Sequence, residues 1–204
     1  RTFLKSFFAV PVVVNPGVFD NEALNFSESL FAAYWTQLWD ITSNTDLYFL
    51  YKTEDNKTWN AGTADDNRAS IGLRHFGTWK GFNYNNEFVY QFGSFGSQTI
   101  HAWTASFNIQ RWFKWGSREY LFGLKTEAIS GDQADDGKLS TFDALYPRGA
   151  YFGRVARFGP SNLIDLHPYF ATSLGRFNLE LDYVAFWRFS NEDGVYNPGL
   201  ILQY

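Results

Sequence analysis

Apolar and polar residues alternate with a period of two along most of this chain. The clearest stretch is 177–188, where Leu179 and Leu181 alternate with Glu180 and Asp182. No window sustains apolar residues at the helical spacing i, i+3, i+4 and i+7. Because successive side chains of a strand point to opposite faces, the pattern predicts an all-β fold of about ten strands without helices. The other alternating segments are 3–14, 29–39, 46–53, 67–76, 84–92, 98–110, 119–127, 163–173 and 199–204.

The connections between these segments differ in length in a regular way. The predicted connections alternate between long and short, with 93–97 intermediate, in the order 15–28, 40–45, 54–66, 77–82, 93–97, 111–118, 128–162, 174–176 and 189–198. In an up-and-down barrel successive connections emerge at opposite ends, and outer-membrane barrels have short turns at one end and long loops at the other. A soluble β-sandwich has no reason to keep this asymmetry. The predicted fold class is therefore a transmembrane antiparallel up-and-down β-barrel.

Composition narrows the class further. The 204 residues are 45% apolar, 21% aromatic and 19% charged, whereas soluble domains carry about 25% charged residues. The longest apolar run, 7–14, is far shorter than the roughly 18 residues of a membrane-spanning helix, which excludes helical membrane proteins. The absence of cysteine excludes disulfide scaffolds and thiolate chemistry. A net charge of −4 argues against a nucleic-acid partner.

Two groups of residues distinguish the ends of the predicted barrel. Trp39, Trp79, Trp112 and Trp115 fall at the short-turn end, where an aromatic girdle would meet the lipid headgroups. Acidic residues gather in the predicted long loops, so that end is expected to be wet and anionic.

The alternation also assigns the two faces of the wall. We expect one face to meet lipid and to carry Ile71, Phe88, Tyr90, Leu179, Leu181 and Tyr183. His75 and His101 are expected at or near this lipid-facing side. The opposite face is expected to line a polar lumen. Its candidate pore-lining residues are Lys5, Lys52, Arg68, Arg74, Glu87, Lys125, Glu180, Asp182 and Arg188, a mixed set of charges. Two roles stay open for the arginines, contact with the cargo and salt bridges to Glu87 or Glu180 that brace the wall, and both can hold at once.

The long segment 128–162 is the second candidate site. A connection of this length is usually functional or disordered. Its later half is rich in aromatic residues such as Phe142 and Phe158, so we expect it to pack at the barrel mouth, while 132–138 stays mobile. Packing there would hold three cations over the lumen as a constriction: Arg148, Arg154 and Arg157.

Catalytic and metal chemistry are weakly represented. Glu180 and Asp182 lie about 7 Å apart by strand rise, a spacing that also occurs in glycoside hydrolases, but lumen carboxylates paired with cations explain them more simply. No nucleophile elbow or phosphate-binding loop is present, and the three histidines lack ligand spacing. Neither an enzyme nor a cofactor is expected. A weak calcium candidate, Asp132, Asp135 and Asp136, competes with a solvated acidic loop tip, because the EF-hand spacing is absent.

Several motifs carry a family resemblance. They are SGD at 130–132, TFDALYP at 141–147 and GPSNLIDLHP at 159–168, supported by VVVNPGVFD at 12–20, EFVYQFG at 87–93 and FWR at 186–188. On these motifs the chain resembles the second half of the alginate-export family of outer-membrane β-barrels.

The resemblance implies a large barrel of about 18 strands, so that 1–204 would be one β-barrel domain incomplete at both ends. It also implies a location in the outer membrane of a Gram-negative bacterium and passive passage of a polysaccharide or oligosaccharide, in the family an alginate-like polyuronate. Expected partners are outer-membrane lipid, the saccharide cargo and other envelope proteins. The alternative is a non-conducting barrel that serves as an anchor, an adhesin or a subunit of an envelope complex.

Overall fold

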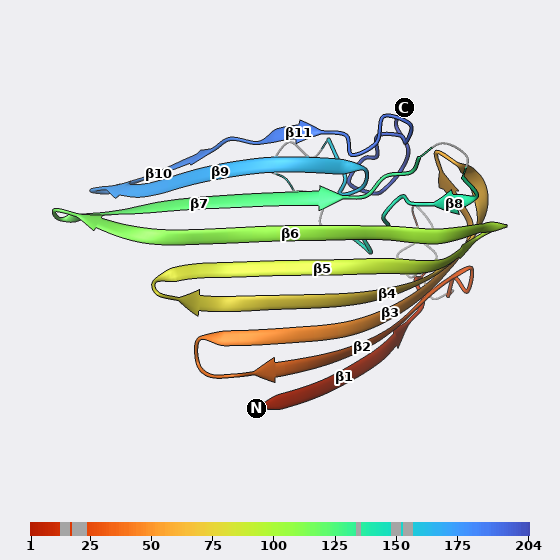
Figure 1. Ribbon diagram of the computed structural model, residues 1–204, viewed down its shortest axis with the longest axis horizontal. Helices are drawn as coiled ribbons and strands as arrows, with labels where there is room; N and C mark the ends of the chain where they lie inside the picture. Colours follow the sequence, from red (N-terminus) through yellow and green to blue (C-terminus); the bar gives the residue numbers. More distant parts are fainter. Residues whose placement is uncertain (13–16, 18–23, 134–135, 148–151, 153–156) are drawn as a thin grey trace.

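The computed structural model describes residues 1–12, 17, 24–133, 136–147, 152 and 157–204 (Figure 1). These residues form strands, turns and loops, and no helix among them is long and apolar enough to cross a membrane. The strands are β1 (Thr2–Ala9), β2 (Glu28–Leu38), β3 (Ser43–Trp59), β4 (Gly62–Trp79), β5 (Phe82–Phe95), β6 (Gln98–Trp115), β7 (Arg118–Ile129), β8 (Lys138–Leu139), β9 (Leu163–Leu174), β10 (Phe177–Asp182) and β11 (Ala185–Trp187). The expectation of an all-β chain is confirmed.

The strands make one sheet in chain order. The hydrogen-bonded path runs β1-β2-β3-β4-β5-β6-β7-β9-β10, and its neighbours are antiparallel. The two-residue β8 pairs with β6 in parallel, and β11 continues beside β9. The sheet is open, with β1 and β10 at its two ends, so this chain does not close into a barrel by itself. Figure 1 shows tight turns at one end of the sheet and the long connections at the other.

The predicted long connection at 54–66 is wrong. β3 and β4 continue far beyond the alternating stretch and meet at a two-residue turn, 60–61. A β-bulge in β3 between Glu54 and Lys57 shifts the register. Beyond it the two strands pair again, with Lys57 of β3 opposite Ala64 of β4. Polar residues occupy both faces of this extension, so no alternation marks it in the sequence. Its acids, including Asp66, therefore lie in a strand pair and not in a wet loop.

Three strand predictions near the chain ends also need correction. The first strand ends at Ala9, before Pro11, which cannot donate to a ladder. The strand predicted over 177–188 is interrupted at 183–184. Here Tyr183 N–H donates to Pro168 O, but proline has no N–H, so Pro168 cannot donate the second hydrogen bond of the ladder pair. The segment 199–204 is not a sheet strand, since Leu202 makes only an isolated bridge to Tyr196.

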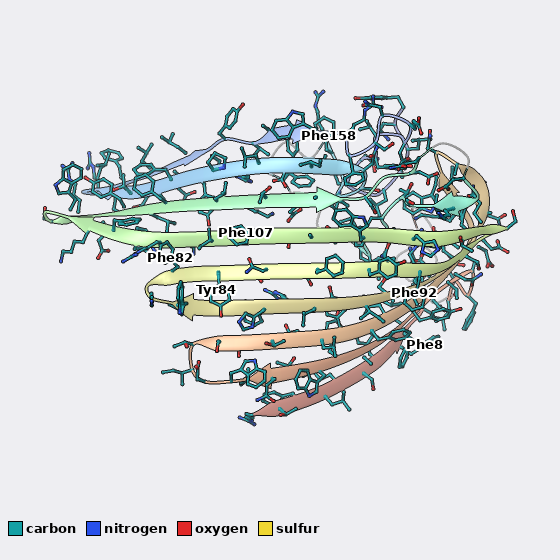
Figure 2. All side chains as sticks on the ribbon, in the orientation of Figure 1. Phe8, Phe82, Tyr84, Phe92, Phe107 and Phe158 are labelled. Atoms are coloured by element: carbon teal, nitrogen blue, oxygen red, sulfur yellow. The ribbon has the colours of Figure 1, made fainter. Side chains whose placement is uncertain are left out.

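The register assigns each strand residue to one of two faces. We call the face that carries Arg68 and Glu87 the inner face, and the face that carries Ile71 and Phe88 the outer face. On the outer face large apolar side chains are exposed, for example Ile71 at 47% and Leu181 at 57%. Figure 2 labels five of its aromatic residues, spread from β1 to β6: Phe8, Phe82, Tyr84, Phe92 and Phe107.

Two tyrosine rings lie flat against the inner face over glycines of the neighbouring strand. A Cβ placed on Gly72 would come within 2.0 Å of the Tyr48 ring, and one on Gly123 within 2.1 Å of the Tyr169 ring. The missing side chain makes room for each ring. The Tyr48 hydroxyl thereby reaches across the strand and donates to Glu87 Oε1 at 2.6 Å.

Gly72→Ala in the full-length protein should destabilise the fold, because the new methyl group collides with the Tyr48 ring. We expect a loss of about 1–3 kcal/mol in the free energy of unfolding, the usual cost of overpacking. In a Tyr48→Leu background the same alanine should cost almost nothing. Equal costs in both backgrounds, measured by urea denaturation, would show that the ring and the glycine are not coupled.

Candidate functional site

The inner face gathers most of the predicted pore-lining residues. The register places Lys5, Lys52, Arg68, Arg74, Glu87, Lys125, Glu180 and Asp182 on it. Arg188 lies one residue beyond β11, where its side chain is exposed and donates to Asn191 O at 3.4 Å. Sharing one face is an observation, and lining a pore stays a prediction.

Residues 138–145, the inward segment, fold back from the long connection onto this face. Leu139 is fully buried, and Phe142 is only 6% exposed. Both join an apolar cluster with Val89, Ile100 and Ile129 of the inner face. Burial of these side chains fixes the segment against the sheet at the end where the long connections gather.

A buried network of charges holds the segment in place. Lys52 Nζ lies 3.1 Å from Asp143 Oδ2 of the segment, 2.6 Å from Glu54 Oε2 and 3.6 Å from Glu28 Oε1. Arg68 donates two hydrogen bonds to the Asp66 carboxylate, at 2.8 and 3.0 Å. It also donates to Thr141 O of the segment at 2.9 Å. The two buried cations of the predicted pore wall are thus engaged in anchoring the segment.

Gln91 adds a backbone clamp to this network. Its amide nitrogen donates to Asp143 O at 2.8 Å, and its amide oxygen accepts from Asp143 N–H at 2.9 Å. The same oxygen accepts from Arg68 at 2.8 Å, so one side chain joins the segment to the wall. Burial alone would raise the pKa of Asp143, but the neighbouring charges of Lys52, Arg68 and Lys57 hold it below its usual range.

The C-terminal residues complete a cap over the same end of the inner face. Asp193 accepts hydrogen bonds from Thr141 Oγ1 and from the Tyr196 hydroxyl, both at 2.7 Å. The Tyr196 ring packs edge-on against Trp59 with centroids 5.4 Å apart, and its hydroxyl accepts from Asn60 N–H at 3.1 Å. The β3–β4 hairpin, the inward segment and the C-terminal residues therefore form one packed unit.

Aromatic residues of the later half of the long connection also find partners. Phe152 and Phe158 both contact Phe186 of β11, with ring centroids 5.2 and 5.5 Å apart. The Tyr146 hydroxyl donates to Glu28 at 2.6 Å. Of the three predicted gate cations, Arg157 is exposed, whereas Arg148 and Arg154 lie outside the described residues.

The described acidic residues of the calcium candidate, Asp132 and Asp136, have separate hydrogen-bond and ion-pair partners. Asp132 accepts from Ser140 N–H at 2.8 Å, and Asp136 forms an exposed ion pair with Lys138 at 3.5 Å. Asp135 lies outside the described residues. In the part of the chain that the structure describes, no group of three or more His, Cys, Asp or Glu side chains is placed to hold a metal ion.

A cavity of about 280 Å³ lies on the inner face beside the inward segment. Its wall combines aromatic and aliphatic surface with charged groups of both signs. The lining residues are Tyr34, Asp46, Tyr48, Leu50, Ser70, Arg74, Glu87, Val89, Gln91, Phe142, Asp143 and Leu145.

The two carboxylates of β10 have separate environments. Asp182 Oδ1 lies 2.9 Å from His167 Nε2 across the β9–β10 pair, a contact that sequence reasoning missed because His167 was treated as isolated. Glu180 is exposed. Lys125 approaches Glu127 at 3.5 Å on the adjacent strand β7. Among the described residues neither Glu180 nor Asp182 forms an ion pair with Lys or Arg, so the expected pairing of both with cations is not observed.

Sequence reasoning identified the wall residues but missed the residues that hold the segment. Asp143 lies inside the TFDALYP motif, which marked the region without showing that this aspartate turns inward. Gln91 likewise lies inside the EFVYQFG motif, which did not reveal its contact, and Asp193 lay outside every motif; the partner of each is 52 residues away in the chain.

The fold is an antiparallel meander sheet whose outer face is apolar and whose inner face carries most of the charged strand residues. The sequence profile described as Alginate export matches residues 4–203 of the chain. The chain therefore belongs to the alginate export family, as its motifs predicted. No curated protein matches the chain.

Asp143→Asn should lower the free energy of local opening of the inward segment by about 1.5–3 kcal/mol, the usual contribution of a hydrogen bond to a charged group. The change should be measurable as faster amide hydrogen exchange over 138–145. Because the folded pKa of Asp143 is lowered, the protection it provides should be complete above the ordinary aspartate pKa of about 3.9. Protection should be lost as the pH falls through the folded pKa.

The matched control is Asp136→Asn, which removes a partly exposed ion pair and should change exchange by less than about 1 kcal/mol. The Asp143→Asn protein should also lose this acid dependence. Identical exchange in both variants would rule out the buried anchor.

Proposed function

We propose that this chain is part of the wall of an outer-membrane β-barrel that passes a polysaccharide or oligosaccharide passively. The sheet would join further strands in a barrel of about 18 strands, with the outer face toward lipid and the inner face toward a water-filled lumen. Membership of the alginate export family supports a role in polysaccharide export. The apolar outer face supports a lipid contact, since an exposed sheet of this kind is costly in water.

The observation that carries the proposal is the inward segment. A segment folded onto the inner face narrows the space that a closed barrel would enclose, which is how a barrel wide enough for a chain of sugars can remain selective. Buried ion pairs and a backbone clamp fix this segment, so it would form a rigid constriction.

The rival function is a barrel that does not conduct and acts as an anchor or as a subunit of an envelope complex. The packed cap of the inward segment and the C-terminal residues favours it, because such a cap could close the lumen. The cavity beside the segment, with Arg74, Glu87 and Asp46 in its wall, favours an open polar path instead.

Single-channel recording on the full-length protein in planar bilayers distinguishes the two. We expect a measurable conductance that increases when residues 139–145 are replaced by a short Gly-Ser linker, because the constriction is removed. Replacing 133–136 in the same way is the control and should change conductance little. A silent wild-type protein that stays silent after the first replacement would support the anchor.

A further inference from the structure

The cavity beside the inward segment has the surface chemistry of a sugar site. The Tyr34 ring stacks on Tyr48 with centroids 5.0 Å apart and planes 28° apart. Tyr48 itself is held flat over Gly72 by its hydrogen bond to Glu87. Tyr34 is only half-buried, so a rigid aromatic surface borders the cavity. The C–H face of a pyranose ring packs on such a surface.

Polar groups around this ring are placed to bind hydroxyl groups. Asp46 accepts one hydrogen bond, from Thr36 Oγ1 at 2.7 Å, and Glu87 Oε1 accepts one from Tyr48. A carboxylate has about four acceptor positions, so both acids keep capacity for a ligand. Arg74 donates through Nε to Asn85 at 2.8 Å, which leaves further N–H groups of a guanidinium that has five.

The charge of the cavity favours neutral sugar units. Its lining holds the carboxylates of Asp46 and Glu87 with one cation, Arg74, while the third carboxylate, Asp143, is already ion-paired with Lys52. A sugar hydroxyl can donate to Asp46 or Glu87, whereas a uronate carboxylate can only accept and would face their negative charge. Lys52 and Arg68, two buried cations of the same face, are already paired with acids.

The rest of the inner face has the same bias. Along its described strand residues the acids outnumber the bases. The acids are Glu28, Asp46, Glu54, Asp66, Glu87, Glu119, Glu127, Asp165, Glu180 and Asp182, and the bases are Lys5, Lys52, Lys57, Arg68, Arg74, Lys114 and Lys125. A polyanion would meet net repulsion along this wall.

We propose that this cavity is a saccharide subsite that binds neutral, hydroxyl-rich sugar units in preference to uronates. Tyr34 stacks on the sugar ring, Asp46 and Glu87 accept from its hydroxyls, and Arg74 donates to its oxygens. The inference rests on the proposed function for its setting, a saccharide path along the inner face, and it names the class of saccharide that this path takes.

Isothermal titration calorimetry on the detergent-solubilised full-length protein tests the subsite without requiring conductance. The neutral probes are maltohexaose, cellohexaose and mannohexaose, and the charged probe is hexaguluronate. At least one neutral hexamer should bind more tightly than hexaguluronate. Tyr34→Leu should weaken its affinity about 2- to 10-fold, the range expected for one aromatic contact, while Tyr90→Leu on the outer face should leave it unchanged.

Glu87→Gln supplies a second readout, because it keeps an acceptor for the Tyr48 hydroxyl but removes one negative charge. It should strengthen hexaguluronate binding relative to the neutral hexamer. Tight hexaguluronate binding by the unaltered protein, no binding of any neutral hexamer, or equal effects of the Tyr34 and Tyr90 variants would each overturn the subsite. None of these binding outcomes depends on whether the protein conducts. A failure of the subsite proposal can therefore be told apart from a failure of the channel proposal.

Discussion

Lys52 occupies the point where the wall of the sheet meets the segment folded onto it. Its ammonium group lies within ion-pair distance of Glu28 and Glu54 on the wall and of Asp143 on the inward segment. An unpaired charge at this depth would be costly, and removal of a partner from a buried pair usually destabilises a protein strongly. The position of the segment, and the cavity beside it, depend on this charge being satisfied from both sides.

The outer and inner faces could be predicted from sequence wherever apolar and polar residues alternate along a strand. Ile71 and Phe88 alternate with Arg74 and Glu87, and the register places them on opposite faces as expected. The rule fails where that contrast ends. The β3–β4 extension carries polar residues on both faces, and at Pro168 the ladder loses a donor that no periodicity reveals. The alternation pattern therefore predicted the strands accurately where the outer face is apolar, and inaccurately beyond those stretches.

The candidate site was predictable only in part. Parity placed Lys52, Arg68 and Arg74 on one face, but charge type left open whether the arginines contact a cargo or brace the wall. The structure pairs Lys52 with an acid 91 residues away and Arg68 with a carbonyl 73 residues away. Such contacts come from how the long connection folds back, which single-strand periodicity does not encode.

The central claim is that one face of this sheet meets lipid, the other meets water, and the inward segment covers part of the wet face. Single-cysteine scanning along β5 tests it directly, since these 204 residues contain no cysteine. In liposomes, cysteines at 85 and 87 should react with a membrane-impermeant thiol reagent, and labels at 88 and 90 should respond to a lipid-soluble quencher. Cysteine at 91 should react only after 139–145 are replaced. Uniform reactivity along β5, or a reactive position 91 beneath the intact segment, would contradict the account.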